Sequence, residues 1–409
     1  MFGTLIDYWH YTGDDSYNDM VMQGMVHQVG DTRDYMPGNQ TSSMGNDDQG
    51  FWAMASMTAA ENLFPDPPEE DDPQWVALVQ GVFNEYTRRW DTENCDGGLR
   101  WQVFNIHQGY RYKNSISNGC LFNIAARLAR YTANDTYAEW AEKVWDWEVD
   151  TGLITSDFKV YDGVTLQEGQ PCNSDMDKAE WSYNAGIFLH GAAALWNYTE
   201  DQIWKDRVEG MLTYSLEKFT KDGVIFEGNC EPIDDCNNDE RSFKAYYLRG
   251  LAAVAHYIPE LYDTVIPTIR KSAEAAAAVC TGSGTQNALG LPAFRGHPNT
   301  ACGQKWTTNG EFDGDMGVGE QLAALSALTY TLVADATGPI TNDTGGTSRG
   351  DPGAGGPDED KLKVLSPITT GDRVGAGFLT TVLLAGIIGG TAFVVMEGKT
   401  IGAGPPPAA

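Results

Sequence analysis

Two adjacent carboxylates at the start of a predicted helix are the residues whose types and spacing best suit catalysis. Asp47 and Asp48 lie between two amide side chains in the run Asn46-Asp47-Asp48-Gln49. Asn46 is a good helix cap, and acidic residues in a first helical turn are stabilised by the helix dipole, so capping is one interpretation. Because adjacent helical residues point about 100° apart, the two carboxyls could also flank one bond at the roughly 5–5.5 Å separation that a retaining glycosidase uses.

The catalytic interpretation gives the two carboxylates different roles. Near the donors of the helix N-terminus, Asp47 would stay ionised and act as the nucleophile. The neighbouring like charge would raise the pKa of Asp48, which would act as the acid/base. The spacing does not distinguish the two positions, so the reverse assignment stays open.

Polar and aromatic side chains at the starts of other predicted helices could form the walls of a sugar site. Hydroxyl recognition needs hydrogen-bonding side chains beside aromatic faces, although each of these side chains could equally pair locally or cap a loop. The predicted substrate-binding residues are Asn46, Gln49, Trp101, Tyr112, Lys113, Asn118, Tyr183, Asn184 and Lys244.

Several other chemistries are disfavoured by the sequence. The six histidines show no H-x-x-x-H ligand spacing, so we expect no catalytic metal. No G-x-S-x-G elbow, phosphate loop or dinucleotide fingerprint occurs in a suitable context, and we expect no cofactor. With 57 acidic against 27 basic residues and a formal charge of −30, nucleic acid is not an expected partner.

The 3.6-residue periodicity of apolar residues predicts an all-α protein with eleven helices. Short and long loops alternate between them, as in helical hairpins arranged in a ring, and an (α/α)6 barrel needs twelve helices. We therefore expect such a barrel with its first helix missing, and short loop strands near 157–161 and 224–227. The predicted helices are 2–12, 16–28, 47–62, 74–91, 117–132, 137–151, 180–197, 201–219, 240–257, 260–280 and 316–336.

Cysteines and glycosylation sequons indicate the secretory pathway. Four sequons begin at Asn39, Asn134, Asn197 and Asn342. The seven cysteines lack paired C-x-x-C spacings, which favours disulfides over a metal site, although connectivity does not follow from one sequence. We expect Cys230–Cys236 and Cys280–Cys302, with Cys95–Cys120 as a further candidate that leaves Cys172 unpaired. No signal peptide precedes Met1, which we interpret as a truncated amino terminus.

The composition divides the chain into four parts. Residues 1–336 form the expected catalytic domain, and 337–373 form a Gly/Pro/Thr-rich linker that we expect to be disordered. Residues 374–396 carry no charge and are long enough to span a bilayer. They could be a transmembrane helix, a cleaved glycolipid-anchor signal or a buried core helix, and a short tail, 397–409, follows.

Several segments, occurring in order over about residues 1–336, resemble glycoside hydrolase family 76, and most closely its fungal cell-wall branch. The resemblance implies an (α/α)6 barrel, retaining attack on α-1,6-linked mannose, Asp47 as nucleophile and Asp48 as acid/base. It also implies that the enzyme trims the mannose-containing glycan of glycolipid-anchored proteins or transfers it onto wall glucan. The segments are Met1 to Trp9, Asn46 to Gln49, Gly97 to Gln102, Tyr112 to Gly119, Trp181 to Gly186 and Arg241 to Lys244.

Two classes of function remain open from the sequence. The first is a mannan endo-1,6-alpha-mannosidase-like enzyme, either a hydrolase or a transglycosylase. The second is a non-catalytic protein that binds mannan or strengthens the cell wall, but such a protein does not need two acids flanking one bond. We expect a monomer at the cell surface or in the wall, attached to the membrane through its C-terminal segment.

Overall fold

The computed structural model describes residues 1–68, 72–283, 295–356 and 369–401. The chain divides into two compact units, Met1–Val103 with Gln108–Leu362 and Phe104–His107 with Lys363–Ala409. The first unit holds all the elements that surround the candidate site, and the second holds the long helix α12 (Thr370–Ile401).

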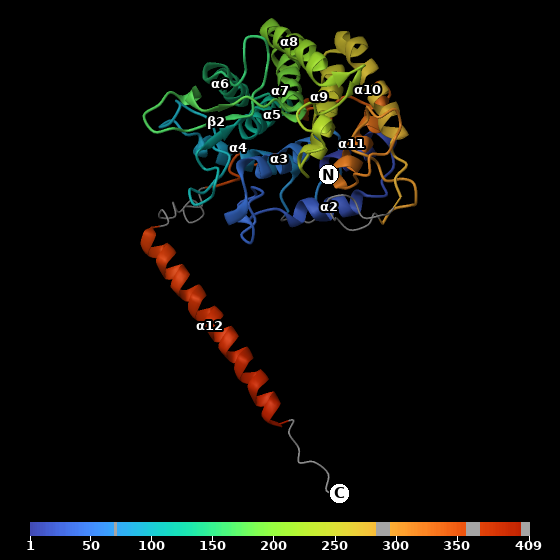
Figure 1. Cartoon of the computed structure of the whole chain (residues 1–409). Coiled ribbons are helices and arrows are strands. Elements are labelled where there is room, and N and C mark those ends of the chain that lie inside the picture. The colour runs from blue at the N-terminus through green and yellow to red at the C-terminus, as the bar shows by residue number, and fades with distance from the viewer. Residues whose placement is uncertain (69–71, 284–294, 357–368, 402–409) are drawn as a thin grey trace. The chain divides into compact units, whose positions relative to one another are not determined.

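Six helices of the first unit form a closed inner ring. Each packs against the next in the order α1, α3, α5, α7, α9 and α11, and α11 returns to α1 beside the N-terminus (Figure 1). This arrangement confirms the predicted all-α barrel. The inner helices are α1 (Phe2–Thr12), α3 (Asn46–Glu61), α5 (Ser115–Thr132), α7 (Ser182–Thr199), α9 (Phe243–Tyr257) and α11 (Val318–Thr329).

Five further helices pack outside this ring. Each follows an inner helix along the chain and packs against it, as in a helical hairpin. Within the described residues no twelfth barrel helix occurs, in agreement with the eleven predicted. The outer helices are α2 (Asn18–His27), α4 (Trp75–Arg89), α6 (Asp135–Thr151), α8 (Gln202–Lys218) and α10 (Tyr262–Ala278).

Burial patterns explain the two layers. In α5, fifteen consecutive residues from Ser115 to Ala129 are buried, which is typical of a helix enclosed on all sides. The outer helix α6 instead buries a stripe that includes Tyr137, Ala141 and Val144. The inner helices α7 and α9 meet at glycines: a Cβ on Gly250 would lie 2.3 Å from the carbonyl oxygen of Gly186. A larger residue at this crossing would push the two helices apart.

Short strands lie in the loops. Strands β1 (Tyr112–Asn114), β2 (Gly163–Thr165) and β3 (Met176–Asp177) form one antiparallel sheet, in which Lys113 pairs with Val164. Strands β4 (Thr220–Lys221) and β5 (Val224–Ile225) form a hairpin at the position of the second predicted strand.

The first predicted strand, at 157–161, is wrong. A turn at Phe158, whose φ is 63°, leaves only an isolated bridge between Ile154 and Val160. The β-branched and aromatic residues of this segment pack around that turn and do not pair along a neighbouring strand.

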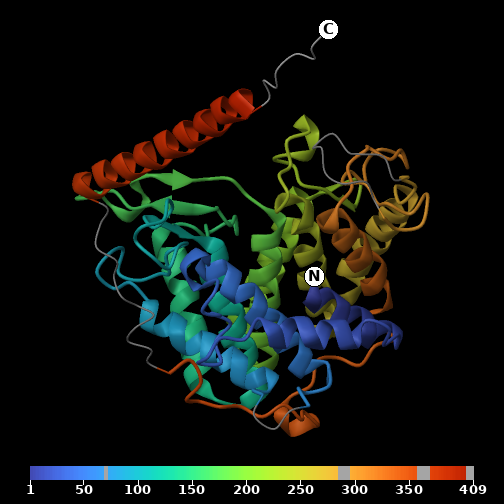
Figure 2. The same ribbon diagram turned by 90° about the horizontal axis from the view of Figure 1, so that it is seen from below.

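The segment expected to be a disordered linker differs in its first half. Residues 337–356 cross the C-terminal ends of the inner helices and reach α4, and Figure 2 shows this segment at the edge of the barrel. Arg130 donates to the carbonyls of Pro339 and Ile340, and Ser348 is 4% exposed. We call 337–356 the base strap. The sequence did not predict this packing, because the base strap has few apolar residues and is held mainly by hydrogen bonds to its backbone. Residues 357–368 of the predicted linker lie outside the described residues, and its last four residues, 370–373, are helical.

The disulfides correct one sequence prediction. Cys230–Cys236 and Cys280–Cys302 are confirmed, but Cys95 bonds to Cys172, and Cys120 is free and buried. Cys120 lies within the barrel wall, where a Cβ on Gly50 of α3 would be 2.7 Å from its sulfur. A thiol enclosed between two inner helices cannot reach a loop cysteine.

All four predicted glycosylation asparagines are exposed. Asn39 and Asn342 lie in turns, Asn134 caps α6 by accepting from the Thr136 backbone N–H, and Asn197 accepts from Arg130. Their positions allow glycan attachment, which stays a prediction.

The second unit contains α12 (Thr370–Ile401). Within the described residues, Thr370–Ala392 is a helical stretch of 23 residues long and apolar enough to cross a membrane. None of this stretch is buried. The tail from 402 onward lies outside the described residues.

Candidate active site

A cleft of about 430 Å³ opens at the N-terminal ends of the inner helices α3, α5, α7 and α9. Aromatic rings and carboxylates dominate its walls, and no Lys, Arg or His side chain lines it among the residues that the structure describes. The lining residues are Asp47, Asp48, Phe51, Trp101, Tyr112, Asn114, Ile116, Asp162, Trp181, Tyr183, Asn237, Asp239, Glu240, Ser242, Phe243 and Tyr246.

Asp47 and Asp48 both face this cleft from the first turn of α3. The indole N–H of Trp101 donates to Asp47 Oδ2 at 2.9 Å, and the backbone N–H of Asp48 donates to Asp47 Oδ1 at 3.0 Å. Asp48 Oδ2 accepts from the backbone N–H of Gly45 at 2.8 Å, so Asp48 helps to cap the helix, but the N-cap residue is Gly45 and not Asn46 as predicted. The cap uses one oxygen of Asp48 and leaves its carboxyl exposed to the cleft. Capping and catalysis are therefore compatible.

The electrostatics of the pair differ from the sequence prediction. Burial, and then the charge of Asp48, raise the pKa of Asp47 to about 7, against the hydrogen bonds from Trp101 and the Asp48 backbone. Burial in the cleft also raises the pKa of Asp48, and the charge of Asp239 raises it further. The donors at the start of α3 therefore do not keep the pKa of Asp47 low, as the sequence prediction assumed, because desolvation outweighs them.

Three of the predicted substrate-binding residues line the cleft. Trp101 is 36% exposed and donates to Asp47, while the hydroxyl of Tyr112 donates to Asp162 at 2.6 Å. The ring of Tyr183 stacks on Phe243 with centroids 3.8 Å apart. These residues offer the aromatic faces and polar edges that a sugar ring requires.

Asn46 and Gln49 lie behind the first turn of α3, which carries Asp47 and Asp48. Asn46 donates to the carbonyl of Arg100, and Gln49 donates to Glu85 and to the carbonyl of Asp34. The guanidinium of Arg89 donates to both amide oxygens. Both side chains are buried, so they fix the first turn of α3 and do not line the cleft.

Lys113 and Asn118 are also buried and hold the loop that carries Trp101. Lys113 donates to the carbonyls of Asp91, Asn94 and Gly97. Asn118 accepts from the backbone N–H of Leu99 and donates to its carbonyl. The predicted direct contact of these side chains with sugar is wrong, since their polar atoms are already bonded within the protein.

Lys244 and Asn184 do not line the cleft either. Lys244 is 0% exposed, pairs with Glu231 at 2.7 Å and lies over the ring of Trp306. Asn184 is 1% exposed in α7, and its amide has no hydrogen-bond partner among the residues that the structure describes. Their polarity suggested a cavity wall, but both side chains are buried and neither lines the cleft.

The sequence prediction missed three carboxylates that line the cleft, Asp162, Asp239 and Glu240. Asp162 lies directly before β2, and burial raises its pKa to about 6, against the hydrogen bond from Tyr112. Asp239 lies just before α9. Asp239 could have been predicted, because it lies just before the Arg241 to Lys244 segment. Asp162 could not, because its contact with Tyr112 depends on strand pairing between β1 and β2.

The same region contains a geometric cluster of Cys230, Cys236 and Glu240. The two sulfurs are joined as a disulfide, so they cannot act as thiolate ligands.

An (α/α)6 barrel with a paired carboxylate in an aromatic cleft at one end is the architecture of a glycoside hydrolase. The model of glycosyl hydrolase family 76 matches residues 1–343, and the chain belongs to this family. Relatives include mannan endo-1,6-alpha-mannosidase DCW1 of Saccharomyces cerevisiae, 43% identical over 95% of this chain and 82% of the relative. DFG5 of Candida albicans, with the same enzyme name, is 40% identical over 96% of this chain and 84% of the relative.

Solved structures agree with this assignment. The crystal structure of Dfg5 from Chaetomium thermophilum in complex with glucosamine is 47% identical, with a TM-score of 0.79 over 87% of this chain and 84% of that one. An inactive variant of the α-1,6-mannanase of Salegentibacter sp., in complex with α-1,6-mannotriose, is 18% identical, with a TM-score of 0.60 over 81% and 87%. The second likeness shows the shared fold.

Proposed function

We propose that this protein is a retaining endo-α-1,6-mannosidase in which Asp47 and Asp48 carry the reaction. The observation that supports this most directly is the placement of both carboxyls in one aromatic cleft at the mouth of the barrel. The curated relatives named mannan endo-1,6-alpha-mannosidase support the linkage. The inactive bacterial variant had two consecutive aspartates replaced by asparagine, a pattern that Asp47 and Asp48 reproduce.

In the proposed mechanism, Asp47 attacks the anomeric carbon while Asp48 donates a proton to the departing glycosidic oxygen. A hydroxyl from water or from a sugar acceptor then loses its proton to Asp48 and displaces Asp47 with a second inversion. Donors from Trp101 and from the Asp48 backbone fix the two oxygens of Asp47, as a nucleophile requires. Asp48 is the more exposed carboxyl, which suits contact with a leaving group. The mechanism requires that Asp47 is ionised and Asp48 is protonated when substrate is bound.

The natural substrate is proposed as α-1,6-mannan or the mannose-containing glycan of a glycolipid anchor. The Chaetomium relative bound to glucosamine makes an amino sugar a further candidate ligand of this cleft. Wall glucan is the proposed acceptor if the enzyme transfers the glycosyl group. We further propose a monomer at the outer cell surface or in the wall, attached by α12 or by a glycolipid that replaces it. Residues 1–356 would then form the catalytic domain, extended by the base strap.

The rival function is mannan binding without cleavage. Its support is that both aspartates also act in the helix cap. Turnover of an oligosaccharide separates the two functions, since a binding protein would retain affinity and release no product.

The test uses an aryl α-1,6-mannobioside with wild type, Asp47→Ala and Asp48→Ala, each with and without azide. Wild type should give the α-anomer as first product. With azide, Asp48→Ala should recover and form an α-glycosyl azide, whereas Asp47→Ala should form a β-glycosyl azide. The opposite pattern would exchange the two roles. Sugar binding by wild type without turnover, with or without a glucan acceptor, would favour the binding protein.

A further inference from the structure

The last turn of the outer helix α4 packs against the first turn of α3. From there, Arg89 donates to the amide oxygen of Asn46 at 2.8 Å and to that of Gln49 at 2.6 Å, so its two contacts lie on either side of the paired aspartates. Arg89 also pairs with Glu85, one turn earlier in α4. The side chain of Arg89 is 10% exposed, which shields these hydrogen bonds from competing water.

These contacts determine which way the two amides point. An arginine side chain donates hydrogen bonds and accepts none, so it turns the oxygen of each amide toward itself. The amide nitrogen of Asn46 is then directed to the carbonyl of Arg100, to which it donates at 2.8 Å. The amide nitrogen of Gln49 donates to Glu85 at 2.7 Å. A lysine would keep the charge but not the planar fork that meets two acceptors at once.

Both hydrogen-bond donors to Asp47 depend on this arrangement. The backbone N–H of Asp48 belongs to the turn that the two amides hold. The indole of Trp101 belongs to a segment that Asn46 holds with its side chain and with its backbone N–H, which donates to the Trp101 carbonyl at 2.8 Å. Arg89 itself does not line the cleft, so it acts on the Asp47 carboxyl through these residues.

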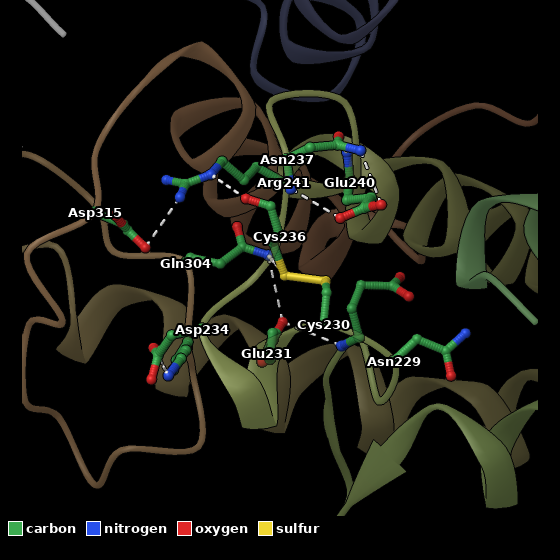
Figure 3. Close-up of a disulfide and its surroundings, with 12 residues drawn as sticks. Asn229, Cys230, Glu231, Asp234, Cys236, Asn237, Glu240, Arg241, Gln304 and Asp315 are labelled. Carbon is green, nitrogen blue, oxygen red and sulfur yellow. Dashed lines mark hydrogen bonds and ion pairs between the residues drawn. A yellow bond between two sulfur atoms is a disulfide. The ribbon is translucent and has the colours of Figure 1, made fainter. Parts of the chain in front are cut away.

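A second arginine holds a different wall of the cleft. Arg241 is 5% exposed, its Nε donates to the carbonyl of Cys236 at 3.1 Å, and its guanidinium pairs with Asp315 at 3.2 Å. Figure 3 shows both contacts beside the Cys230–Cys236 disulfide. They fix the segment 237–242, part of which lines the cleft. This segment supplies no reacting group in the proposed mechanism, so Arg241 provides a comparison for Arg89.

We infer that Arg89 is a positioning residue, which holds the nucleophile Asp47 in the orientation that attack on the anomeric carbon requires. The inference rests on the proposed function, since it assigns a role in the same reaction. Misplacement of a reacting atom by about 1 Å can lower a rate by about 10²-fold. A loss of alignment in the transition state lowers kcat, whereas a loosened wall weakens sugar binding and raises KM.

The experiment compares three charge-conserving variants, Arg89→Lys, Arg88→Lys and Arg241→Lys, in their turnover of α-1,6-mannotetraose. Arg89→Lys should lower kcat by about 10- to 100-fold and leave KM within about twofold of wild type. Arg241→Lys should raise KM more than it lowers kcat. Arg88→Lys is the matched control: Arg88 is the neighbouring residue of α4 and donates to the carbonyl of Gly355 in the base strap, so kcat and KM should not change.

Thermal unfolding checks that each variant is folded. If Arg89→Lys does not fold, the double variant Glu85→Gln/Arg89→Gln takes its place. It removes both charges of the buried pair, so no carboxylate is left uncompensated, and it should show the same loss of kcat because the fork to the two amides is still missing.

A second measurement follows Asp47 without substrate. Weakened donors disfavour the ionised carboxyl, so Arg89→Lys should raise the pKa of Asp47, and Arg88→Lys should leave it unchanged. Titration of the aspartate carboxyls by ¹³C NMR, with Asp47→Asn to identify the signal, measures this shift. Because the variant keeps its positive charge, a shift reports the altered geometry of the donors.

An unchanged kcat or an unchanged titration of Asp47 in Arg89→Lys would overturn the inference. So would the same change of kcat and KM in Arg89→Lys and Arg241→Lys, because general loosening of the cleft would then explain both. Wild-type turnover tests the proposed function separately. Wild type that does not cleave the tetraose would contradict the hydrolase, and the NMR titration would still show whether Arg89 holds Asp47.

Discussion

The acidic residues at the mouth of the barrel and those at its base differ in whether they have basic partners. At the mouth, Asp47, Asp48 and Asp239 line a cleft without a basic partner. At the base, where the inner helices end, each buried acid is paired with an arginine. Like charges without counter-ions lower the stability of the folded protein, and such clusters of acids with raised pKa values are typical of functional sites.

The base contains a fully paired polar network. Arg127 pairs with Glu61 at 2.6 Å, and Tyr257 donates to the other oxygen of Glu61. Arg249 pairs with Asp7 at 2.7 Å, and further hydrogen bonds from Tyr330 and Asn62 complete the set around Asp7. Every oxygen of these two carboxylates has a partner, which is what a buried ion pair needs to be tolerated.

The base strap closes this network from outside. The imidazole of His10 bonds to the carbonyl of Thr337 at 2.8 Å, and the backbone N–H of Ile340 donates to the carbonyl of Glu61. No comparable segment covers the mouth among the described residues. The same ring of helices therefore presents one end to substrate and seals the other.

The largest expected effect separates activity from stability at the mouth. Asp48→Asn should lower kcat/KM by about 10²–10⁴-fold, because it removes the proton donor. Its free energy of unfolding at pH 8 should not fall, since a carboxyl of raised pKa is removed. Initial rates on α-1,6-mannotetraose and denaturant unfolding measure the two quantities. A stability loss as large as that of a core substitution would mean that the helix cap, and not catalysis, is the main role of Asp48.

The base should show the reverse behaviour. Arg127→Met leaves Glu61 buried and uncompensated, and the free energy of unfolding should fall by about 3–5 kcal/mol. The remaining folded protein should turn over substrate at close to the wild-type rate. The double variant Arg127→Met/Glu61→Gln is the control and should recover part of the loss. A cost below about 1 kcal/mol for the single variant would show that water reaches the base.

The two ends should also respond to pH with opposite signs. Asp47 has a folded pKa of about 7, above its unfolded value, so its contribution to stability is lost as the pH rises from about 4 through 7. Burial lowers the pKa of His256 at the base to about 4, so its contribution is lost as the pH falls below about 6.5. Between about pH 4 and 7, Asp47→Asn should remove a fall in stability with rising pH, and His256→Gln should remove a rise in stability with rising pH; unfolding measured from pH 4 to 8 checks both. No change in either profile would contradict the stated cause.

The sequence predicted features that depend on neighbouring residues and missed features that depend on residues far apart in the chain. The helix periodicity predicted the ring, and the motif Asn46 to Gln49 indicated the two carboxylates that lie together in one cleft, because both are local patterns. The side chains Lys113, Asn118 and Lys244 were predicted to line the cleft and do not, since a polar residue at or just before the start of a helix can face either the cleft or the interior of the protein. Only the fold determines which loop carbonyls Lys113 meets. Cys172 and Asp162 were missed for the same reason, because their partners lie far away in the chain.

The smallest expected effect tests whether the base strap is part of the domain. The hydroxyl of Ser348 accepts from the backbone N–H of Val76 at 3.1 Å, in the first turn of α4, so a residue distant in sequence caps this helix. Ser348→Ala should lower the free energy of unfolding by about 0.5–2 kcal/mol, as for other lost caps. Asp343→Asn is a control in an exposed turn of the same strap and should have little effect. Equal stability of both variants would show that the strap is not folded against α4. A clear difference would extend the catalytic domain past residue 336, since a cap can stabilise a helix only if the strap is docked on it.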